Sequence, residues 1–386
     1  MTPKDPGTLP RTVQAFEAGR RQGLHRGGLI YVSRHGEVVA DLALGEARPG
    51  RPMDESTRIL WLSSSKPFTA VAIAQLWERG LLELDEPIAR FVPEFAERGK
   101  EKITLRHALT HTGGFRLLNL GWPQASWEEV VEKICRARPE PRWILGETAG
   151  YHLASSWFML GEVVRRLSGR TFEDYVREEI FEPLGMTRST IGMAEEVFEG
   201  IAEDVAVMEN TESRAAVAFP WHKRPYLTRS NPGANGCGPV RELARLYEMF
   251  LRRGTTASGG RLLRPQTVEA LSCPHRVGLF DKTFRAVLDW GLGLIINSQH
   301  YLPRNGEAPG AENPAIVPYG YGRFASRRTF GHSGRRSSTA FADPEHGLAV
   351  AFAVNGIPAA DHHDRRTQSL VEGIYQDLGL APPEAS

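Results

Sequence analysis

Ser63 and Lys66 are the first residues in the sequence whose types and spacing fit a chemical role. Residues three apart on a helix share a face, so the hydroxyl and the amine would lie side by side. A serine hydroxyl is a weak nucleophile at neutral pH, and a lysine whose pKa is lowered by burial can serve as its base. A capping serine followed by a solvated lysine has the same spacing, so the pair alone leaves both interpretations open. Ser64 and Ser65 have no lysine three residues on, and we interpret them as capping or structural hydroxyls.

A second group of interest is Gly150-Tyr151-His152, just before a predicted helix that starts near Ser155. A tyrosine beside a lysine amine can take a proton from a nucleophile and return it to a leaving group. His152 can also act as a base. A packed aromatic residue at a helix entrance is the alternative interpretation of Tyr151.

The third group is Gly331-His332-Ser333-Gly334, which the pattern places on an inner strand. Glycine in a strand permits close approach of a bound substrate to the backbone. The next amide, that of Arg335, could pair with the Ser63 amide to form an oxyanion hole. A bend in a strand, with His332 simply hydrogen-bonded, is the alternative.

Other chemical motifs are absent from the sequence. It has no G-x-S-x-G elbow, and His107 and His111 stand four apart without an H-E-x-x-H motif. Cys135, Cys237 and Cys273 have neither the number nor the spacing of a disulfide framework or a zinc site. We therefore predict structural roles for the two histidines and expect no metal or cofactor.

The segment after Ser63 must position the Ser/Lys pair. Phe68–Trp77 is apolar nearly all round and ends at Gly80, which predicts a buried helix. An unpaired lysine at the start of a buried helix would be costly, and this favours a functional role for Lys66.

The rest of the chain alternates between strand and helix patterns. Strands are predicted at Gly28–Ser33 and Val38–Gly45, joined by a turn at His35-Gly36, and at Arg327–Ala342 and Leu348–Asn355. Helices are predicted at Val13–Gln22, Trp127–Cys135, Ser155–Leu167, Thr171–Phe181, Val240–Leu251 and Thr367–Leu378. We predict an α/β (α+β) fold with an antiparallel sheet flanked by helices. Residues 1–62 and 255–386 would form a discontinuous mixed domain and residues 63–254 an inserted, mainly helical domain, with the active site in the cleft between them.

Composition narrows the functional classes. The chain has 386 residues, 41% hydrophobic and 24% charged, as expected for a globular enzyme. Its 47 basic and 46 acidic residues give no electrostatic reason to expect nucleic acid or an anionic membrane as partner. The first residues lack the apolar stretch of a signal peptide, and the apolar runs are too short to span a bilayer. These features predict a soluble, cytoplasmic protein that acts on a small molecule; the sequence does not predict its oligomeric state.

Taken together, the three motifs make the sequence resemble the serine β-lactamase and penicillin-binding-protein superfamily. Within it, the chain is similar to the class C β-lactamase-related esterases, often called family VIII carboxylesterases. The likeness covers nearly the whole chain and includes "LWLSSSKPFTAVAIAQLWERG", "GYHLASSWFMLGEVVRRLSGRTFEDYV" and "FGHSGRRSSTAFADPEHGLAVAFAVNG". It implies that Ser63 is the acylated nucleophile, that Lys66 activates it and that Tyr151 is the general base and acid. It also implies an oxyanion hole formed by the amides of Ser63 and Arg335.

Two departures from the family pattern bear on the substrate. The second motif is usually Tyr-x-Asn, but its third position here is Leu153; His152, Ser155 or Asn235 would then replace the missing amide. A competing register would put His152 itself at the tyrosine position. In the third motif His332 stands where β-lactamases have the lysine of K-T-G, with Ser333 and Gly334 beside it as further substrate contacts.

A neutral histidine anchors a substrate carboxylate less well than a lysine, so both departures argue against efficient β-lactam or cell-wall peptide turnover. The prediction is a serine carboxylesterase for small to medium esters. Acyl transfer to an alcohol or amine in natural-product tailoring, β-lactam or D-amino-acid amide hydrolysis, and an inactive binding protein of the same fold remain alternatives.

Several aromatic side chains are candidates for the wall of the substrate site. They are Trp61, Phe115, Trp122, Trp290 and Tyr321. A core position is the alternative for each of them, and we favour it for Trp61 and Trp290. The segment Gln299–Tyr321, rich in Pro, Gly and Asn, is either a loop at the cleft or a surface excursion.

Overall fold

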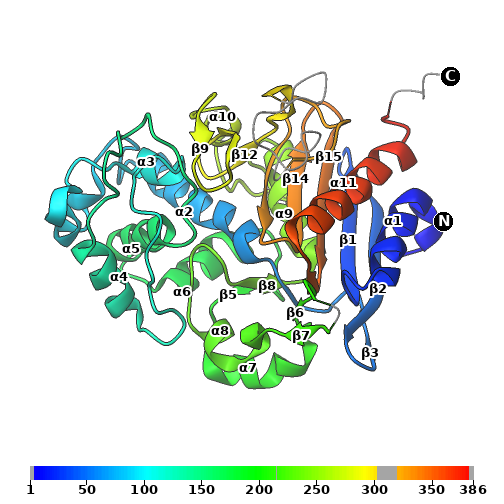
Figure 1. The fold of residues 1–386 in the computed structure, drawn as a ribbon. Coiled ribbons are helices and arrows are strands. Elements are labelled where there is room, and N and C mark those ends of the chain that lie inside the picture. Colours follow the sequence, from blue (N-terminus) through cyan, green and yellow to red (C-terminus); the bar gives the residue numbers. More distant parts are fainter. Residues whose placement is uncertain (1–3, 214, 302–319, 382–386) are drawn as a thin grey trace.

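The largest element of the fold is an eight-stranded antiparallel sheet at the side of the molecule that carries both termini (Figure 1). The computed structural model describes residues 4–213, 215–301 and 320–381. The strand order is β11-β12-β13-β14-β15-β1-β2-β3. The bounds are β1 Gly27–Arg34, β2 Glu37–Arg48, β3 Arg51–Pro52, β11 Asp289–Trp290, β12 Ile295–Ile296, β13 Phe330–Gly334, β14 Ser338–Asp343 and β15 Leu348–Val354. The two ends of the chain therefore build one sheet, since β15 pairs directly with β1.

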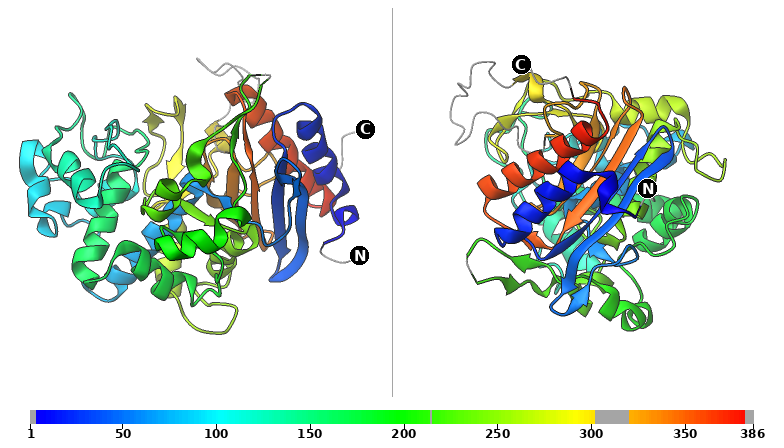
Figure 2. Two further views of the ribbon diagram at one scale, coloured as in Figure 1. Left: turned by 90° about the horizontal axis from the view of Figure 1, so that it is seen from below. Right: turned by 90° about the vertical axis from the view of Figure 1, so that its right-hand side faces the viewer.

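Helices cover both faces of this sheet. Helices α1 (Pro10–Arg21) and α11 (Ala360–Asp377) lie side by side on the outer face, as the right-hand view of Figure 2 shows. Helix α9 (Val240–Leu251) packs on the other face against β1, β14 and β15. The predicted domain boundary at residue 254 thus assigns α9 to the helical domain, although its packing contacts are with the sheet. The boundary itself remains a prediction.

The middle of the chain forms a mainly helical part on the opposite side of the molecule (Figures 1 and 2). Its helices are α2 Lys66–Glu78, α3 Leu105–Leu109, α4 Trp127–Arg136, α5 Ser155–Ser168, α6 Phe172–Val176, α7 Glu195–Ile201, α8 Arg224–Thr228 and α10 Pro265–Ser272. Short strands complete it and link it to the sheet: β4 Ile59–Leu60, β5 Thr190–Ile191, β6 Glu209–Asn210, β7 Val217–Ala218, β8 Gly236–Gly238, β9 Phe280–Asp281, β10 Ala286–Val287 and β16 Gly356–Ile357. No helix of the described residues is long and apolar enough to cross a membrane.

Helix α2 runs between the two parts of the molecule and is buried on every side. Every residue from Lys66 to Leu76 is buried, as the apolar composition predicts. It packs against α5, α6 and α10. A turn of 3₁₀-helix at Leu62–Ser65 leads into it, so Ser63 and Lys66 lie at the start of this central helix.

One predicted strand is wrong. The segment Arg327–Ala342 is not a single strand but a hairpin, β13 and β14, joined by a turn in which the Ser337 N–H donates to the Gly334 carbonyl at 2.8 Å. The turn places Arg336 at φ 55° without any Asn, Pro or second Gly to signal it. The consequence is that Arg335 lies at the tip of a hairpin, where its amide is not part of the strand ladder.

Gly334 fixes how closely strand β13 approaches the turn that carries Ser63. A Cβ at position 334 would lie 2.2 Å from the Trp61 carbonyl oxygen and 2.9 Å from the Leu62 Cβ. Such contacts are far inside van der Waals distance, and a backbone oxygen cannot rotate away. The glycine is therefore required for the sheet to meet the Leu62–Ser65 turn.

We expect Gly334→Ala to separate β13 from that turn and to lower the free energy of unfolding by about 1–3 kcal/mol, as measured by chemical denaturation. Gly200→Ala in α7 is the matched control, because a Cβ there meets nothing within 4 Å. Since alanine favours a helix over glycine, the control should be neutral or more stable by up to about 1 kcal/mol. Equal stability of the two variants would contradict this account of Gly334.

Candidate active site

Ser63 is placed by a strained turn. The preceding residue, Leu62, has φ 51°, which a branched side chain rarely adopts. Ser63 is partly exposed, whereas its neighbours Leu62, Ser64 and Ser65 are buried. The turn thus presents one hydroxyl of the three to solvent.

The other two serines hold the turn in place. The Ser64 hydroxyl lies 3.1 Å from the His332 carbonyl and 2.9 Å from the Ser338 hydroxyl, which ties the turn to β13 and β14. The Ser65 hydroxyl donates to the Leu62 carbonyl at 2.6 Å and accepts from the Gly236 N–H at 2.9 Å. These contacts fit the structural roles predicted for both residues.

Lys66 is fully buried, and its amine has three neighbours. Nζ lies 3.0 Å from the Ser63 Oγ, 2.9 Å from the Leu153 carbonyl oxygen and 2.7 Å from the Gly233 carbonyl oxygen. Its described contacts include no carboxylate. Burial lowers the pKa of the Lys66 amine well below its ordinary value of 10.5, because a charged ammonium loses its hydration there.

Tyr151 lies beside this amine in the interior. Its side chain is 3% exposed, and the Lys66 Nζ is 5.0 Å from the centroid of its ring. Four aromatic rings surround it, with centroids 4.7 Å (His111 and Phe284), 5.8 Å (Trp290) and 6.0 Å (His332) away. The structure therefore brings together Ser63, Lys66, Tyr151 and His332 from three separate segments, as the sequence predicts.

His152 hydrogen-bonds to residues outside this group. Its ring Nε2 accepts a hydrogen bond from the Phe115 backbone N–H at 3.3 Å, and the backbone N–H of His152 donates to the His111 Nδ1 at 3.0 Å. Burial lowers the pKa of His152 to about 3. The nitrogen that would accept a proton is already engaged, so the geometry favours Tyr151 over His152 as the residue that exchanges protons beside Lys66.

His332 presents a proton acceptor. Its Nδ1 is 2.8 Å from the Ser333 carbonyl oxygen, which can only accept, so Nδ1 carries the hydrogen and Nε2 a lone pair. Burial and the nearby Lys66 lower the pKa of His332 to about 3, which keeps the ring neutral at physiological pH. Its Nε2 is buried and has no hydrogen-bond partner among the described residues.

Two predicted substrate contacts are engaged elsewhere. The Ser155 hydroxyl donates to the Phe115 carbonyl at 2.6 Å. The Asn235 amide donates to the carbonyls of Tyr226 and Arg229 and accepts from the Asn231 N–H. We assign both residues to the support of the loops around the site. Ser333 is similar, since its hydroxyl lies 3.1 Å from that of Thr339.

Sequence reasoning missed the two carbonyl groups that hold Lys66. Leu153 replaces the asparagine of the family motif, yet its backbone oxygen binds the amine while its side chain is exposed. Gly233 belongs to a Pro-Gly turn in which only the polar Asn235 was a predicted site residue. Backbone carbonyls are the same at every position, so no residue type could have signalled them.

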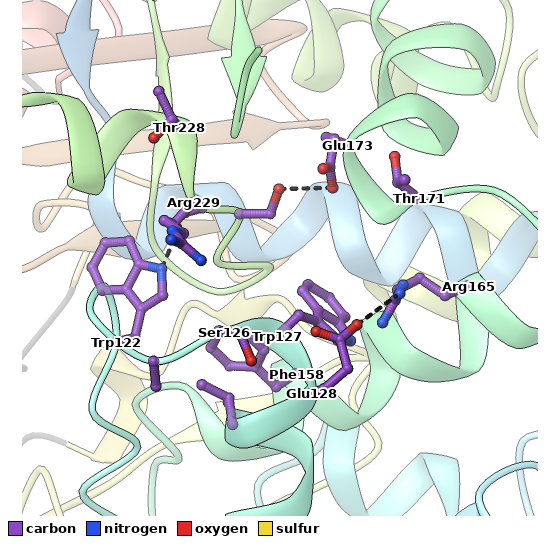
Figure 3. A pocket seen from close by; sticks show the side chains of 13 residues that line it. Trp122, Ser126, Trp127, Glu128, Phe158, Arg165, Thr171, Glu173, Thr228 and Arg229 are labelled. Atoms are coloured by element: carbon purple, nitrogen blue, oxygen red, sulfur yellow. Dashed lines mark hydrogen bonds and ion pairs between the residues drawn. The ribbon is translucent and has the colours of Figure 1, made fainter. Parts of the chain in front are cut away.

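The predicted aromatic wall residues fall into two groups. Trp61, Phe115, Trp290 and Tyr321 are buried at 0–1% exposure, so the core positions favoured for Trp61 and Trp290 are confirmed. Trp122 instead lines a separate pocket of about 270 Å³ next to Arg229 and Phe158 (Figure 3). Of the segment Gln299–Tyr321, residues 302–319 lie outside the described part of the chain.

Fold and sequence together define the class of this protein. The chain belongs to the Beta-lactamase family, whose model matches residues 12–373. The match spans both the sheet and the helical part, so the whole architecture is that of the family.

Individual relatives are consistent with this assignment. The chain is 28% identical over 372 residues to the esterase/beta-lactamase LipL of Mycobacterium tuberculosis, covering 89% of this chain and 80% of that protein. Among solved structures, a penicillin-binding protein homologue from Caulobacter crescentus matches with a TM-score of 0.78 and 28% identity, over 97% of this chain and 99% of that one. A family VIII carboxylesterase shares the fold with a TM-score of 0.77 at 24% identity, over 98% and 99% of the two chains.

The buried histidines predict a loss of stability in acid. His152 and His332 have a pKa of about 3 in the folded protein, against about 6.5 when unfolded, so between these values the unfolded chain binds more protons. Each should therefore remove about 1.4 kcal/mol of stability per pH unit below pH 6.5. Denaturation curves at pH 7, 6 and 5 measure this slope. We expect a shallower slope for His332→Gln and an unchanged one for the exposed His362→Gln; equal slopes for both variants would contradict the assignment.

Proposed function

We propose that this protein is a serine hydrolase that cleaves small to medium carboxylic esters through an acyl-enzyme on Ser63. The observation that carries the proposal is the buried Lys66 amine 3.0 Å from the hydroxyl of the partly exposed Ser63, in a chain of the Beta-lactamase family. The S-x-x-K spacing supplies the nucleophile and its base within one helical turn. The names of the relatives, esterases among them, support the same reaction class.

The contacts of Lys66 suit a neutral amine. A neutral amine has two N–H groups and one lone pair, and the two carbonyls of Leu153 and Gly233 can accept both N–H groups. The lone pair is then left for the hydrogen of the Ser63 hydroxyl. Lys100, also buried, differs: its Nζ contacts three carbonyls, of Glu97, Cys135 and Ala137, and so satisfies all three hydrogens of an ammonium.

The reaction would proceed in two halves. Lys66 takes the hydroxyl proton while the Ser63 Oγ attacks the ester carbonyl. The first hydrogen bond of the 3₁₀ turn runs from the Ser64 N–H to the Trp61 carbonyl. The Ser63 N–H precedes this bond and takes no part in the hydrogen bonding of the turn. It can therefore bind the oxyanion together with the Arg335 N–H. Tyr151 donates its phenol proton to the leaving alkoxide, which departs as an alcohol, and the phenolate takes back a proton from the Lys66 ammonium beside it. Water then attacks the acyl-enzyme by the same route and releases the acid.

His332 supports a neutral substrate. A β-lactam or peptide carboxylate needs a cation, but the buried His332 ring is neutral and offers a lone pair at Nε2. The asparagine that would contact a substrate amide is replaced by Leu153, whose side chain is exposed. Both features favour an ester over a β-lactam or peptide.

The nucleophile is tested by Ser63→Ala with p-nitrophenyl butyrate as substrate. We expect kcat to fall by about 10⁴-fold or more, because the acyl-enzyme cannot form. Ser258→Ala, which removes an exposed serine in a surface turn, is the control and should retain wild-type turnover. An acyl adduct mapped to Ser63 by mass spectrometry would complete the evidence, whereas undiminished hydrolysis by Ser63→Ala would exclude this mechanism.

The base is tested by Lys66→Ala and by the pH profile. We expect kcat/KM of the wild type to rise with pH through a single ionisation well below 10.5, since the amine must lose its proton to act. Lys66→Ala should lose about 10³-fold in acylation rate and the ionisation with it. Lys100→Ala also removes a buried lysine but should keep both the rate per folded molecule and the profile. A profile shared by wild type and Lys66→Ala would assign the base to another group.

A further inference from the structure

Tyr151 lies in a segment without helix or strand, so its backbone must find partners elsewhere. Its N–H donates to the Asp281 Oδ1 at 3.1 Å, and its carbonyl accepts from the Thr283 hydroxyl at 3.1 Å. Both partners come from the β9 hairpin, about 130 residues further along the chain. The position of Tyr151 therefore depends on that hairpin.

Asp281 is a fully buried carboxylate, and both of its oxygens accept hydrogen bonds. Besides the Tyr151 N–H, its Oδ1 accepts the N–H groups of Thr283 at 2.9 Å and Phe284 at 3.0 Å. Its Oδ2 accepts from the Arg276 Nη2 at 3.1 Å. A carboxylate so enclosed has no room to exchange protons with a substrate, which excludes a direct acid or base role.

Arg276 extends the same connection to the far side of Tyr151. Its guanidinium is buried, donates to the carbonyls of Thr110 and Leu288, and lies 5.1 Å from the Trp290 ring centroid. Trp290 in turn packs against Tyr151. The ion pair thus joins the Thr110 loop, the Tyr151 segment and β11 at one point.

Buried ion pairs contribute little to stability on balance, because desolvation of both charges offsets their attraction. An ion pair buried at this point therefore needs an explanation other than stability. The one the contacts offer is geometric: Asp281 is the acceptor that fixes the Tyr151 backbone, and Arg276 fixes Asp281.

We propose that Asp281, held by Arg276, is a positioning residue that sets the Tyr151 phenol against Lys66 and the substrate. The inference rests on the proposed function, in which Tyr151 moves protons in each half of the reaction. In this proposal Asp281 influences the reaction through Tyr151 and does not touch the substrate, so its removal should affect turnover and leave substrate binding largely intact.

The first experiment compares Asp281→Asn with Asp289→Asn in ester hydrolysis. The amide keeps the shape of Asp281 but turns an N–H group toward Arg276 and breaks the pair. We expect kcat to fall about 100-fold with KM changed by less than about threefold, the effect of displacing a catalytic group by about 1 Å. Asp289 is a matched control, because it is buried nearby and its carboxylate accepts hydrogen bonds from the Gly278 N–H and the Tyr301 hydroxyl. A kcat loss of similar size in both variants would overturn the proposal.

The second experiment is a double-mutant cycle with Tyr151→Phe. If Asp281 acts through the phenol, Asp281→Asn should lower kcat by less than about threefold once the hydroxyl is gone. Independent, multiplicative losses would assign Asp281 a purely structural role and overturn the proposal. Wild-type turnover by Tyr151→Phe would overturn it together with the proposed role of Tyr151, whereas normal turnover by Asp281→Asn alone would overturn only the positioning role.

Two further measurements keep the test decisive. If Asp281→Asn does not fold, Thr283→Val takes its place in the cycle, because it removes the partner of the Tyr151 carbonyl from a partly exposed site. If the wild type hydrolyses no ester tested, the rate at which a fluorophosphonate labels Ser63 replaces kcat. The proposed ester function would then fail by itself, and the cycle of labelling rates would still support or overturn the role of Asp281.

Discussion

A lysine amine buried with no carboxylate among its described contacts is the constraint on which this site depends. Taking an ammonium out of water is costly, so burial lowers the pKa of Lys66. Two backbone carbonyls accept hydrogen bonds from the amine. Those carbonyls belong to Leu153 and Gly233, in separate segments about 90 and 170 residues away in sequence. The loops that carry them, and with them Tyr151, must therefore close around the start of α2.

Backbone carbonyls stabilise buried cations at several other places in this chain. Lys100 is held by three of them, and the Arg366 guanidinium by the carbonyls of Leu24, Gly356 and Arg336. In those places the acceptors suit a charged group. Around Lys66 one of the three neighbours is a partly exposed serine hydroxyl. The amine is therefore placed to exchange a proton with that hydroxyl, which the carbonyls around Lys100 and Arg366 cannot do.

The two parts of the molecule meet where the sheet touches the turn before α2. Gly334 lets β13 approach the Trp61 carbonyl, and the Ser64 hydroxyl bonds to the His332 backbone. This contact puts the Arg335 amide at a hairpin tip beside the Ser63 segment. The proposed nucleophile belongs to the helical part and the proposed second oxyanion donor to the sheet, so the proposed reaction depends on how the two parts pack against each other.

The sequence by itself determined the family, the buried helix α2, the longer helices and the strands β1, β2 and β15, because motif spacing and apolar periodicity are local properties. The resemblance to the family, and no local pattern, predicted that Ser63, Lys66, Tyr151 and His332 share one site. The sequence did not determine the β13–β14 turn, where Arg336 takes a left-handed conformation without the usual residue types. Nor did it separate Ser155 and Asn235 from substrate contacts, since a polar side chain gives no sign of where its partner lies. Only the tertiary structure decided which carbonyls hold Lys66 and which carboxylate holds Tyr151. Those contacts join residues far apart in the chain, and one partner in each is a backbone group that every sequence contains.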